Sequence, residues 1–248
     1  MKARSICSNI ISRHSMLAVI GAALVGAILF PTYALCQGAK PDPIALAKRY
    51  SLAATANAEM MKSYGWSMRV EITLDGKTQP AQLYLMRYDS SGKLQKTGLT
   101  PAPQASKPGL RGSIQKKKMN EFKAWSDKLA ELLKQYAAPT PGTMLDFYTK
   151  ATYSAQGDGI VIVSGNNLLQ QGDHADFWMD LYAGTPVQYS FSTNLQKDAV
   201  SATIQFDQIP GGPRYAATVN VEVPSKNMTA KIETFNYVRQ TQGVSAYN

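Results

Sequence analysis

The chain has 248 residues, of which 44% are hydrophobic and 17% are charged, and both values are ordinary for a folded protein. Its formal net charge is +9, which favours solubility and anionic partners without requiring either. The only two cysteines, Cys7 and Cys36, precede Gln37. A mature chain that begins at Gln37 therefore excludes a disulfide bond, a thiol nucleophile and a zinc–thiolate site.

Residues 1–36 are predicted to be a cleavable signal peptide. Basic residues are followed by an uncharged apolar run at 16–30, which is shorter than the roughly 20 residues that a membrane-spanning helix needs. Ala34 and Cys36 offer the small residues of a cleavage site. We therefore expect a periplasmic protein with a single domain at 37–248. An uncleaved membrane anchor and lipidation of Cys36 are the alternatives.

The first element of the mature chain is predicted to be a helix that begins at Pro43 and ends near Gly65. Proline suits the first turn of a helix, and Asp42 is a suitable N-cap. Apolar residues then recur at steps of three and four, which marks one face of a helix: Ala47, Tyr50, Ala54, Ala58 and Met61.

From Trp66 onward, apolar and polar residues alternate, which predicts a strand with one apolar and one solvated face. Asp75 and Gly76 form a strong hairpin signal, and the return strand at 81–89 is apolar on both faces. A third, more polar strand is expected at 93–99.

After a proline-rich stretch at 100–109, a helical insertion is predicted at about 113–138. It begins with the basic residues of "RGSIQKKKMNEFKAW" and ends at the prolines of "APTPG". Its apolar residues fall on one helical stripe, which consists of Met119, Phe122, Trp125, Leu129, Leu132, Leu133 and Tyr136. A short helix is expected to follow in 143–151.

The last hundred residues read as six consecutive strands separated by turn residues, which is typical of an antiparallel meander. Together the elements predict an α+β fold. It consists of a strongly curved antiparallel sheet, an unclosed half-barrel of about eight or nine strands. The N-terminal helix and the inserted amphipathic helix are expected to cover its concave face.

Apolar residues of the early strands and of the inserted helix are predicted to line a cavity between sheet and helix. Methionine adapts to irregular apolar shapes, which suits varied ligands. The alternative is that these side chains are ordinary core. The predicted ligand-binding residues are Trp66, Met68, Tyr84, Met86, Tyr88, Phe122, Trp125 and Leu129.

Four cations open the inserted helix: Arg111, Lys116, Lys117 and Lys118. Cations in a first turn oppose the helix dipole by about 0.3 to 1 kcal/mol each, so helix propensity alone does not explain them. Contact with an anionic membrane surface would explain them, because each lysine near such a surface contributes about 1 kcal/mol to binding. An anionic headgroup, an envelope protein and plain solvation are the alternatives. Nucleic acid is excluded as a partner, because export removes the target and no recognition motif accompanies the cluster.

The sequence offers little catalytic chemistry. His174 is the one histidine after residue 36, and it lies beside Asp173 and near Asp176 on what reads as a solvated turn. No metalloprotease, phosphate-loop or dinucleotide motif occurs, and no nucleophile elbow presents a serine for a triad. We therefore predict no catalytic residue, no metal and no cofactor.

Two stretches, "RGSIQKKKMNEFKAWSDKLAELLKQY" and "NLLQQGDHADFWMDLYAG", together with the leader and the order of elements, carry a family resemblance. The chain from about 43 to 238 resembles the superfamily of bacterial lipoprotein-localisation carriers (LolA/LolB-like, outer-membrane lipoprotein sorting). It also resembles uncharacterised secreted bacterial proteins. The carriers are periplasmic, and their helices plug a curved antiparallel sheet. The resemblance implies binding of acyl chains or another apolar ligand, with Arg69 and Arg87 as candidates for the carriers' ligand-gating arginine.

The sequence thus predicts a periplasmic, non-enzymatic protein that binds a lipid, an acyl chain or another hydrophobic small molecule. One alternative is a structural or interaction protein of the cell envelope without a ligand cavity. The other is a hydrolase that uses His174.

Overall fold

The structure, a computed structural model, describes residues 41–100 and 110–240, which all belong to one unit of the chain. The predicted signal peptide and the proline-rich stretch at 101–109 lie outside the described residues. Side chains are described for 41–100 and 120–240. None of the helices in this part of the chain has the length and apolar character needed to span a membrane.

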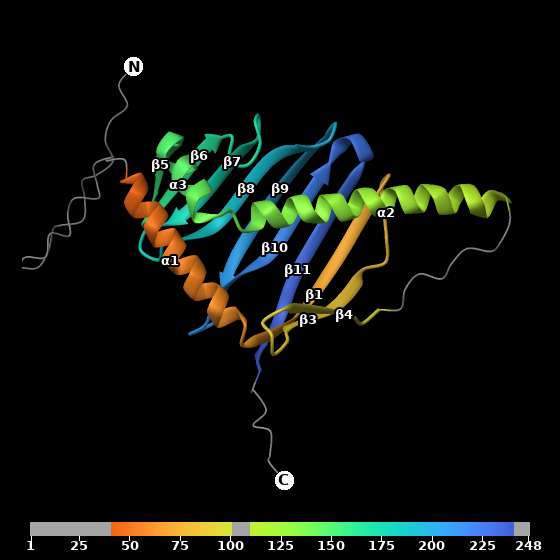
Figure 1. The fold of residues 1–248 in the computed structure, drawn as a ribbon, viewed down its shortest axis with the longest axis horizontal. Helices are drawn as coiled ribbons and strands as arrows, with labels where there is room; N and C mark the ends of the chain where they lie inside the picture. Colours follow the sequence, from red (N-terminus) through yellow and green to blue (C-terminus); the bar gives the residue numbers. More distant parts are fainter. Residues whose placement is uncertain (1–40, 101–109, 241–248) are drawn as a thin grey trace, which may run out of the picture. The chain divides into compact units, whose positions relative to one another are not determined.

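An antiparallel sheet dominates the fold, with the strand order β4-β3-β1-β11-β10-β9-β8-β7-β6-β5 (Figure 1). The outermost strands β4 and β5 do not pair with each other, so the sheet is curved but unclosed, and the predicted α+β class is confirmed. The strands are β1 (Tyr64–Leu74), β2 (Lys77–Thr78), β3 (Gln82–Tyr88), β4 (Leu94–Gly98), β5 (Thr152–Gly157), β6 (Ile160–Asn166), β7 (His174–Asp180), β8 (Thr185–Leu195), β9 (Asp198–Gln208), β10 (Arg214–Val223) and β11 (Met228–Arg239).

The strand count of 11 exceeds the predicted eight or nine, because two strands carry no apolar signal. β2 has only two residues and pairs with β1 alone. β5, with the sequence TYSAQG, is mostly exposed. The predicted hairpin turn is present: Asp75 and Gly76 both have positive φ, 51° and 72°, as a type I′ turn requires.

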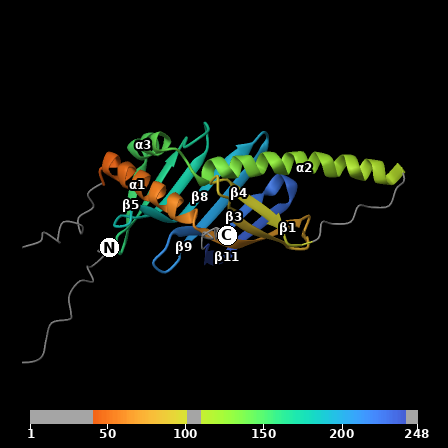
Figure 2. The ribbon, with the colours of Figure 1, turned by 60° about the horizontal axis from the view of Figure 1, so that its bottom comes forward.

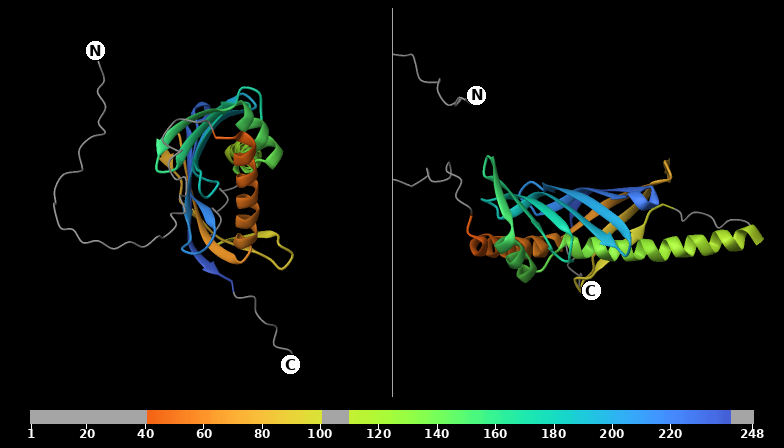
Figure 3. Two further views of the ribbon diagram at one scale, coloured as in Figure 1. Left: turned by 90° about the vertical axis from the view of Figure 1, so that its left-hand side faces the viewer. Right: turned by 90° about the horizontal axis from the view of Figure 1, so that it is seen from above.

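Three helices, α1 (Pro43–Met61), α2 (Leu110–Ala137) and α3 (Pro141–Lys150), lie on one side of the sheet (Figure 3). The carboxylate of Asp42 caps α1 by accepting a hydrogen bond of 3.0 Å from the N–H of Ile44, as its position predicted. The hydroxyl of Thr140 caps α3 in the same way. The inserted helix α2 begins three residues before its predicted start.

The connection from β4 to β5 must cross the whole sheet, because these strands form opposite edges. Most of this distance is crossed by α2, which runs over the strands (Figures 1 and 2). A helix of 28 residues is about 42 Å long. The six strand spacings from β8 to β4 cover only about 29 Å. The N-terminal turns of α2 therefore project beyond the sheet edge, as Figure 1 shows.

The core lies between the helices and the face of the sheet that they cover. Side chains from adjacent strands form rows in register, for example Val163, Phe177, Tyr189 and Ile204, and all four are at most 5% exposed. The helices contribute Leu46, Ala47, Leu129, Leu132, Tyr136, Met144, Phe147 and Tyr148.

A buried hydrogen-bond network fixes the C-terminal end of α2. The hydroxyl of Tyr136 donates to the carboxylate of Asp173 at 2.5 Å and lies 2.9 Å from the hydroxyl of Thr193. Asp173 also accepts three backbone N–H groups from residues 168–170. Asp173 is 1% exposed, so the solvated turn expected here is instead a buried anchor.

Candidate functional site

The helices cover the concave face unevenly. On β10 and β11, the paired residues Val223 and Met228 are 0% and 4% exposed. Four residues farther along, the paired Val219 and Ile232 are only half-buried, as is Val70, which pairs with Ile232 on β1. Figure 1 shows α1 and α2 diverging over these strands. A partly uncovered apolar surface, here called the floor and defined by Met68, Val70, Phe206, Ala216, Val219 and Ile232, lies between them.

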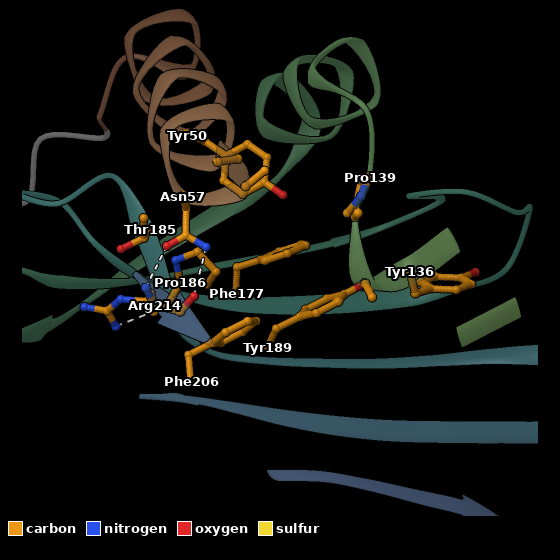
Figure 4. Close-up of a pocket in the computed structure, with 14 residues that line it drawn as sticks. Tyr50, Asn57, Tyr136, Pro139, Phe177, Thr185, Pro186, Tyr189, Phe206 and Arg214 are labelled. Atoms are coloured by element: carbon orange, nitrogen blue, oxygen red, sulfur yellow. Dashed lines mark hydrogen bonds between the residues drawn. The ribbon is translucent and has the colours of Figure 1, made fainter. Parts of the chain in front are cut away.

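A cavity of about 260 Å³ adjoins the floor, between α1 and the end of α2 (Figure 4). One wall is a stripe on α1, and another is the chain that leaves α2. Phe206 belongs to both the cavity and the floor. The lining residues are Tyr50, Ala54, Asn57, Ala58, Tyr136, Ala137, Ala138, Pro139, Phe177, Thr185, Pro186, Tyr189, Phe206 and Arg214.

α1 is held at the cavity by the side-chain amide of Asn57. Its Nδ2 donates to the backbone oxygen of Arg214 at 2.8 Å, and its Oδ1 accepts from the N–H of Arg214 at 2.6 Å. The amide thus replaces a strand partner at the first residue of β10. Farther up the helix, Tyr50 packs edge-to-face against Tyr148 of α3 at 6.5 Å, and burial raises the pKa of Tyr50. Both contacts fix the position of the α1 wall.

Aromatic rings form the base of the cavity. Phe177 and Tyr189 stack with ring centres 4.1 Å apart and an interplanar angle of 7°. Tyr136 and Phe191 repeat this arrangement at 4.1 Å and 8°. Such stacked pairs add about 0.5 to 1.5 kcal/mol to the gain from burial, so the base of the cavity is rigid.

Two buried hydroxyls at the cavity have no hydrogen-bond partner among the described residues: Thr185 Oγ1 and Tyr189 Oη. Tyr189 is 2% exposed, and burial raises the pKa of its hydroxyl well above the ordinary value. It is therefore a neutral donor at physiological pH. A buried polar group without a partner costs about 1 to 3 kcal/mol, so these two hydroxyls mark positions where a ligand atom would be stabilised.

Among the residues that the structure describes, Arg214 is the only charged one that lines the cavity. Its guanidinium makes one long contact, 3.5 Å from Nη1 to the backbone oxygen of Pro186. It forms no ion pair within the described residues. Arg214 and Thr185 lie together at the end of the cavity next to Asn57, whereas the ring of Tyr189 points from the sheet toward Pro139 (Figure 4).

The five predicted ligand-binding residues of the early strands lie together on the concave face. Trp66 pairs with Met86, and Met68 with Tyr84. Trp66 and Met86 are buried, and the other three are half-buried. The ring of Trp66 stacks on Tyr237 at 5.6 Å and lies 6.0 Å from Tyr88. Met68 belongs to the floor and the other four lie beside it, and none of the five lines the cavity.

The three predicted residues of the inserted helix lie at the other end of the strands. Leu129 is buried, and Phe122 packs against Trp125 at 6.0 Å. The Nε1 of Trp125 donates to Asp198 at 3.0 Å. Asp198 begins β9 and also accepts from Ser225, in the single turn η1 (Pro224–Lys226) that precedes β11.

β1 separates the two predicted groups. Its first residues carry Trp66, and its last residue Leu74 pairs with Met228, next to η1. Eight residues of strand span about 26 Å. The structure therefore does not bring the eight residues into one lining. Sequence reasoning missed the cavity itself, although Tyr50, Ala54 and Ala58 were recognised as one helical face.

The two arginines considered as gating residues point away from the concave face, and this corrects the expectation drawn from the resemblance. Side chains alternate along a strand, so Arg69 and Arg87 face opposite to Met68 and Met86. Arg69 forms ion pairs with Glu71 at 2.7 Å and Glu233 at 3.3 Å, and Arg87 is exposed. The arginine at the cavity is Arg214.

The predicted cationic residues Arg111, Lys116, Lys117 and Lys118 lie on the N-terminal turns of α2, the part of the helix that projects beyond the sheet (Figure 1). Their side chains lie outside the described part of the structure. The backbone thus places these four positions away from the cavity, at the far end of the same helix.

His174 belongs to a polar cluster on the convex face. Its Nδ1 lies 2.8 Å from Asn166 Oδ1, and its Nε2 lies 3.2 Å from Asp176 Oδ1 and 3.5 Å from Ser164 Oγ. The hydroxyl of Ser164 donates directly to Asp176 at 2.5 Å. A catalytic triad needs the carboxylate on the ring nitrogen remote from the serine, so this order differs from a triad. Among the described residues, no group of three or more His, Cys, Asp or Glu could hold a metal ion.

Comparisons with known proteins give a likeness of fold. No protein-family model matches the sequence, and no curated protein matches it significantly. A LolA superfamily protein from Nitrosomonas europaea is similar in structure, with 10% identity, a TM-score of 0.36 and coverage of 79% of this chain and 94% of that one. A Vibrio parahaemolyticus domain described as a putative outer membrane lipoprotein-sorting protein is 10% identical, with a TM-score of 0.36 and coverage of 82% of this chain and 94% of that one. A DUF1329 family protein from Desulfovibrio piger is 11% identical, with a TM-score of 0.34 and coverage of 82% of this chain and 95% of that one.

Proposed function

We propose that this protein is a periplasmic, non-enzymatic binding protein whose concave face takes up an apolar ligand such as the acyl chain of a lipid. One observation carries the proposal: the apolar floor is left partly uncovered between α1 and α2, and it continues into a cavity lined by aromatic residues. Soluble proteins normally bury such a surface, and an uncovered one marks a binding site.

The floor and the cavity act as one site in this proposal. The cavity of about 260 Å³ is smaller than the roughly 300 to 1,000 Å³ of typical ligand pockets. It therefore takes one end of the ligand, and the remainder lies along the floor. Each buried methylene contributes about 0.8 kcal/mol, so about ten methylenes supply about 8 kcal/mol before the costs of ordering the chain.

A fluorescent fatty acid, cis-parinaric acid, tests the proposal with a matched pair of substitutions on α1. Ala54 lines the cavity and is exposed, so Ala54→Trp fills the space without displacing core residues. Ala56 is also exposed and does not line the cavity, so Ala56→Trp is the control. We expect Ala54→Trp to weaken binding by about tenfold or more, equivalent to about 1.4 kcal/mol, and Ala56→Trp to leave it unchanged.

The proposal fails if the unaltered protein shows no saturable uptake of the fluorescent fatty acid and its native mass spectrum contains no co-purified lipid. Equal weakening by the two tryptophan variants would place binding outside the cavity. If neither uptake nor co-purified lipid is found, the structural role in the cell envelope, without a ligand cavity, becomes the better account.

A further inference from the structure

We propose that the cavity between α1 and α2 binds the anionic, oxygen-bearing headgroup of an amphiphile through Arg214 and Thr185, while the apolar chain lies along the floor. This inference rests on the proposed function and makes it more specific, because an apolar cavity by itself would accept a neutral lipid equally well.

The charge at the cavity favours an anion. Within the described residues, Arg214 is the only charged residue that lines the cavity, and its guanidinium has one long contact to a backbone oxygen and no carboxylate partner. Guanidinium groups bind carboxylates and phosphates through two parallel hydrogen bonds. The backbone N–H and oxygen of Arg214 are already bonded to Asn57, so the residue is fixed while its side chain stays available.

The hydroxyl of Thr185 points to the same chemistry independently. Thr185 Oγ1 is buried at this cavity without a partner among the described residues, and Thr185 lies at the same end of the cavity as Arg214 (Figure 4). A hydroxyl donates to an anionic oxygen more strongly than to a neutral one. An oxygen-rich headgroup satisfies this hydroxyl, whereas a hydrocarbon chain end would leave it unpaired.

The orientation follows from where the polar groups lie. Arg214 and Thr185 are at the α1 end of the cavity (Figure 4), and Phe206 connects the cavity to the floor through its pairing with Ala216. Beyond Ala216, the floor has Met68, Val70, Val219 and Ile232 and no charged side chain. A headgroup in the cavity therefore leaves the chain on the apolar surface.

The test compares three ligands of equal chain length: a fatty acid, the corresponding fatty alcohol and a lysophosphatidic acid, each displacing a neutral fluorescent lipid from the whole protein. We expect the two anionic ligands to bind at least about tenfold more tightly than the alcohol. Arg214→Gln should remove this difference and leave alcohol binding unchanged. Arg49→Gln is the control, because Arg49 also lies on the α1 side, bonds to Leu181 and does not line the cavity.

Thr185→Val gives a second, independent readout. It removes a hydroxyl that has no partner among the described residues, so the urea midpoint of the ligand-free protein should rise or stay constant while affinity for the fatty acid falls. Tyr136→Phe should lower the midpoint, because its hydroxyl is bonded to Asp173. A purely structural role for Thr185 predicts a lower midpoint and unchanged affinity, which would overturn its part in the site.

The outcomes separate the two proposals. If the alcohol binds as tightly as the acid and Arg214→Gln changes neither, the headgroup site is wrong and the acyl-binding function stands. If no amphiphile displaces the lipid, both proposals fail. A preference for the phosphate over the carboxylate, or the reverse, identifies the source of the anionic group.

Discussion

The hydroxyl of Tyr136 donates a hydrogen bond of 2.5 Å to the carboxylate of Asp173, and this contact joins the last turn of α2 to the connection between β6 and β7. Asp173 holds its position by accepting three backbone N–H groups. The C-terminal end of α2 is therefore fixed, while its N-terminal turns project beyond the sheet (Figure 1). The wall of the cavity that follows α2 is a rigid part of the fold.

Tyr136→Phe should destabilise the protein by about 1 to 3 kcal/mol, because it removes one of the three hydrogen bonds that Oδ2 of the buried Asp173 carboxylate accepts. Urea unfolding measures this loss as a lower midpoint. Tyr182→Phe is the control, since Tyr182 is 74% exposed and should have no effect. An unchanged midpoint for Tyr136→Phe would show that the network does not hold the helix.

Val219→Thr should weaken binding of the fatty acid by about fivefold, or about 1 kcal/mol. The substitution keeps the shape of the side chain and places a hydroxyl on the floor, where the acyl chain would otherwise contact two methyl groups. Asn220→Thr introduces the same residue on the opposite, solvated face. Fluorescence titration of both variants checks the prediction, and equal affinities would remove β10 from the site.

Asp198 gives the protein a pH-dependent contact between α2 and the sheet. The hydrogen bond from Ser225, followed by those from Lys226 and Trp125, holds the pKa of Asp198 below its ordinary value. A carboxyl group with a lowered folded-state pKa contributes stability above its unfolded pKa of about 3.9. That contribution is lost as the pH falls through the folded-state pKa.

Ser225→Ala should therefore lower the urea midpoint at pH 7, and the difference from the unaltered protein should shrink as the pH is lowered past about 4 toward the folded-state pKa. Urea unfolding at a series of pH values from 7 down to 2 measures this difference in midpoint. Ser154→Ala, at an exposed position of β5, controls for the general effect of losing a serine. A difference that is constant at every pH would assign the effect to packing instead of charge.

The lysines on the projecting end of α2 suit contact with an anionic membrane. Lys116, Lys117 and Lys118 changed together to Glu should reduce sedimentation with phosphatidylglycerol vesicles by more than tenfold, because each lysine contributes about 1 kcal/mol at such a surface. Fatty-acid binding should not change. The same triple change at Lys123, Lys128 and Lys134 gives an equal net charge on the same helix. Equal losses of vesicle sedimentation for the two variants would show that the effect depends on net charge alone and not on the position of the lysines.

His174→Ala tests the hydrolase alternative. Because Ser164 donates directly to Asp176 on the convex face, we expect the rate of hydrolysis of p-nitrophenyl esters to be the same with and without the imidazole. Affinity for the fatty acid should also be unchanged. A rate that disappears in the variant would restore the hydrolase as the leading function.

Much of the fold was predictable because its signals are local. Asp42 and Pro43 identify the start of α1, and Asp75–Gly76 identifies the hairpin, through side-chain and φ preferences that act within a few residues. The apolar alternation from Trp66 to Leu74 predicts both the strand and its buried face. Strand β5 was missed because its sequence, TYSAQG, is polar at an exposed edge.

The candidate site could not be predicted in the same way. The eight proposed lining residues satisfy the helical and strand periods, but those periods say nothing about which end of a strand a helix crosses. Trp125 reaches Asp198 at one end of the sheet, and Trp66 reaches Tyr237 at the other. Arg214 and Tyr189 belong to strands that the sequence identified, yet no local signal distinguishes them from their neighbours.

The sequence by itself determined which segments are helices and strands, which faces are apolar, and that an amphipathic helix interrupts a meander. The tertiary structure decided that β1 pairs with both β3 and β11, that α1 and α2 diverge over the sheet, and that the hydroxyls of Tyr189 and Thr185 are buried without a partner among the described residues. The reason is physical: secondary structure depends on preferences within a few residues, whereas a cavity depends on how closely segments distant in the chain can pack.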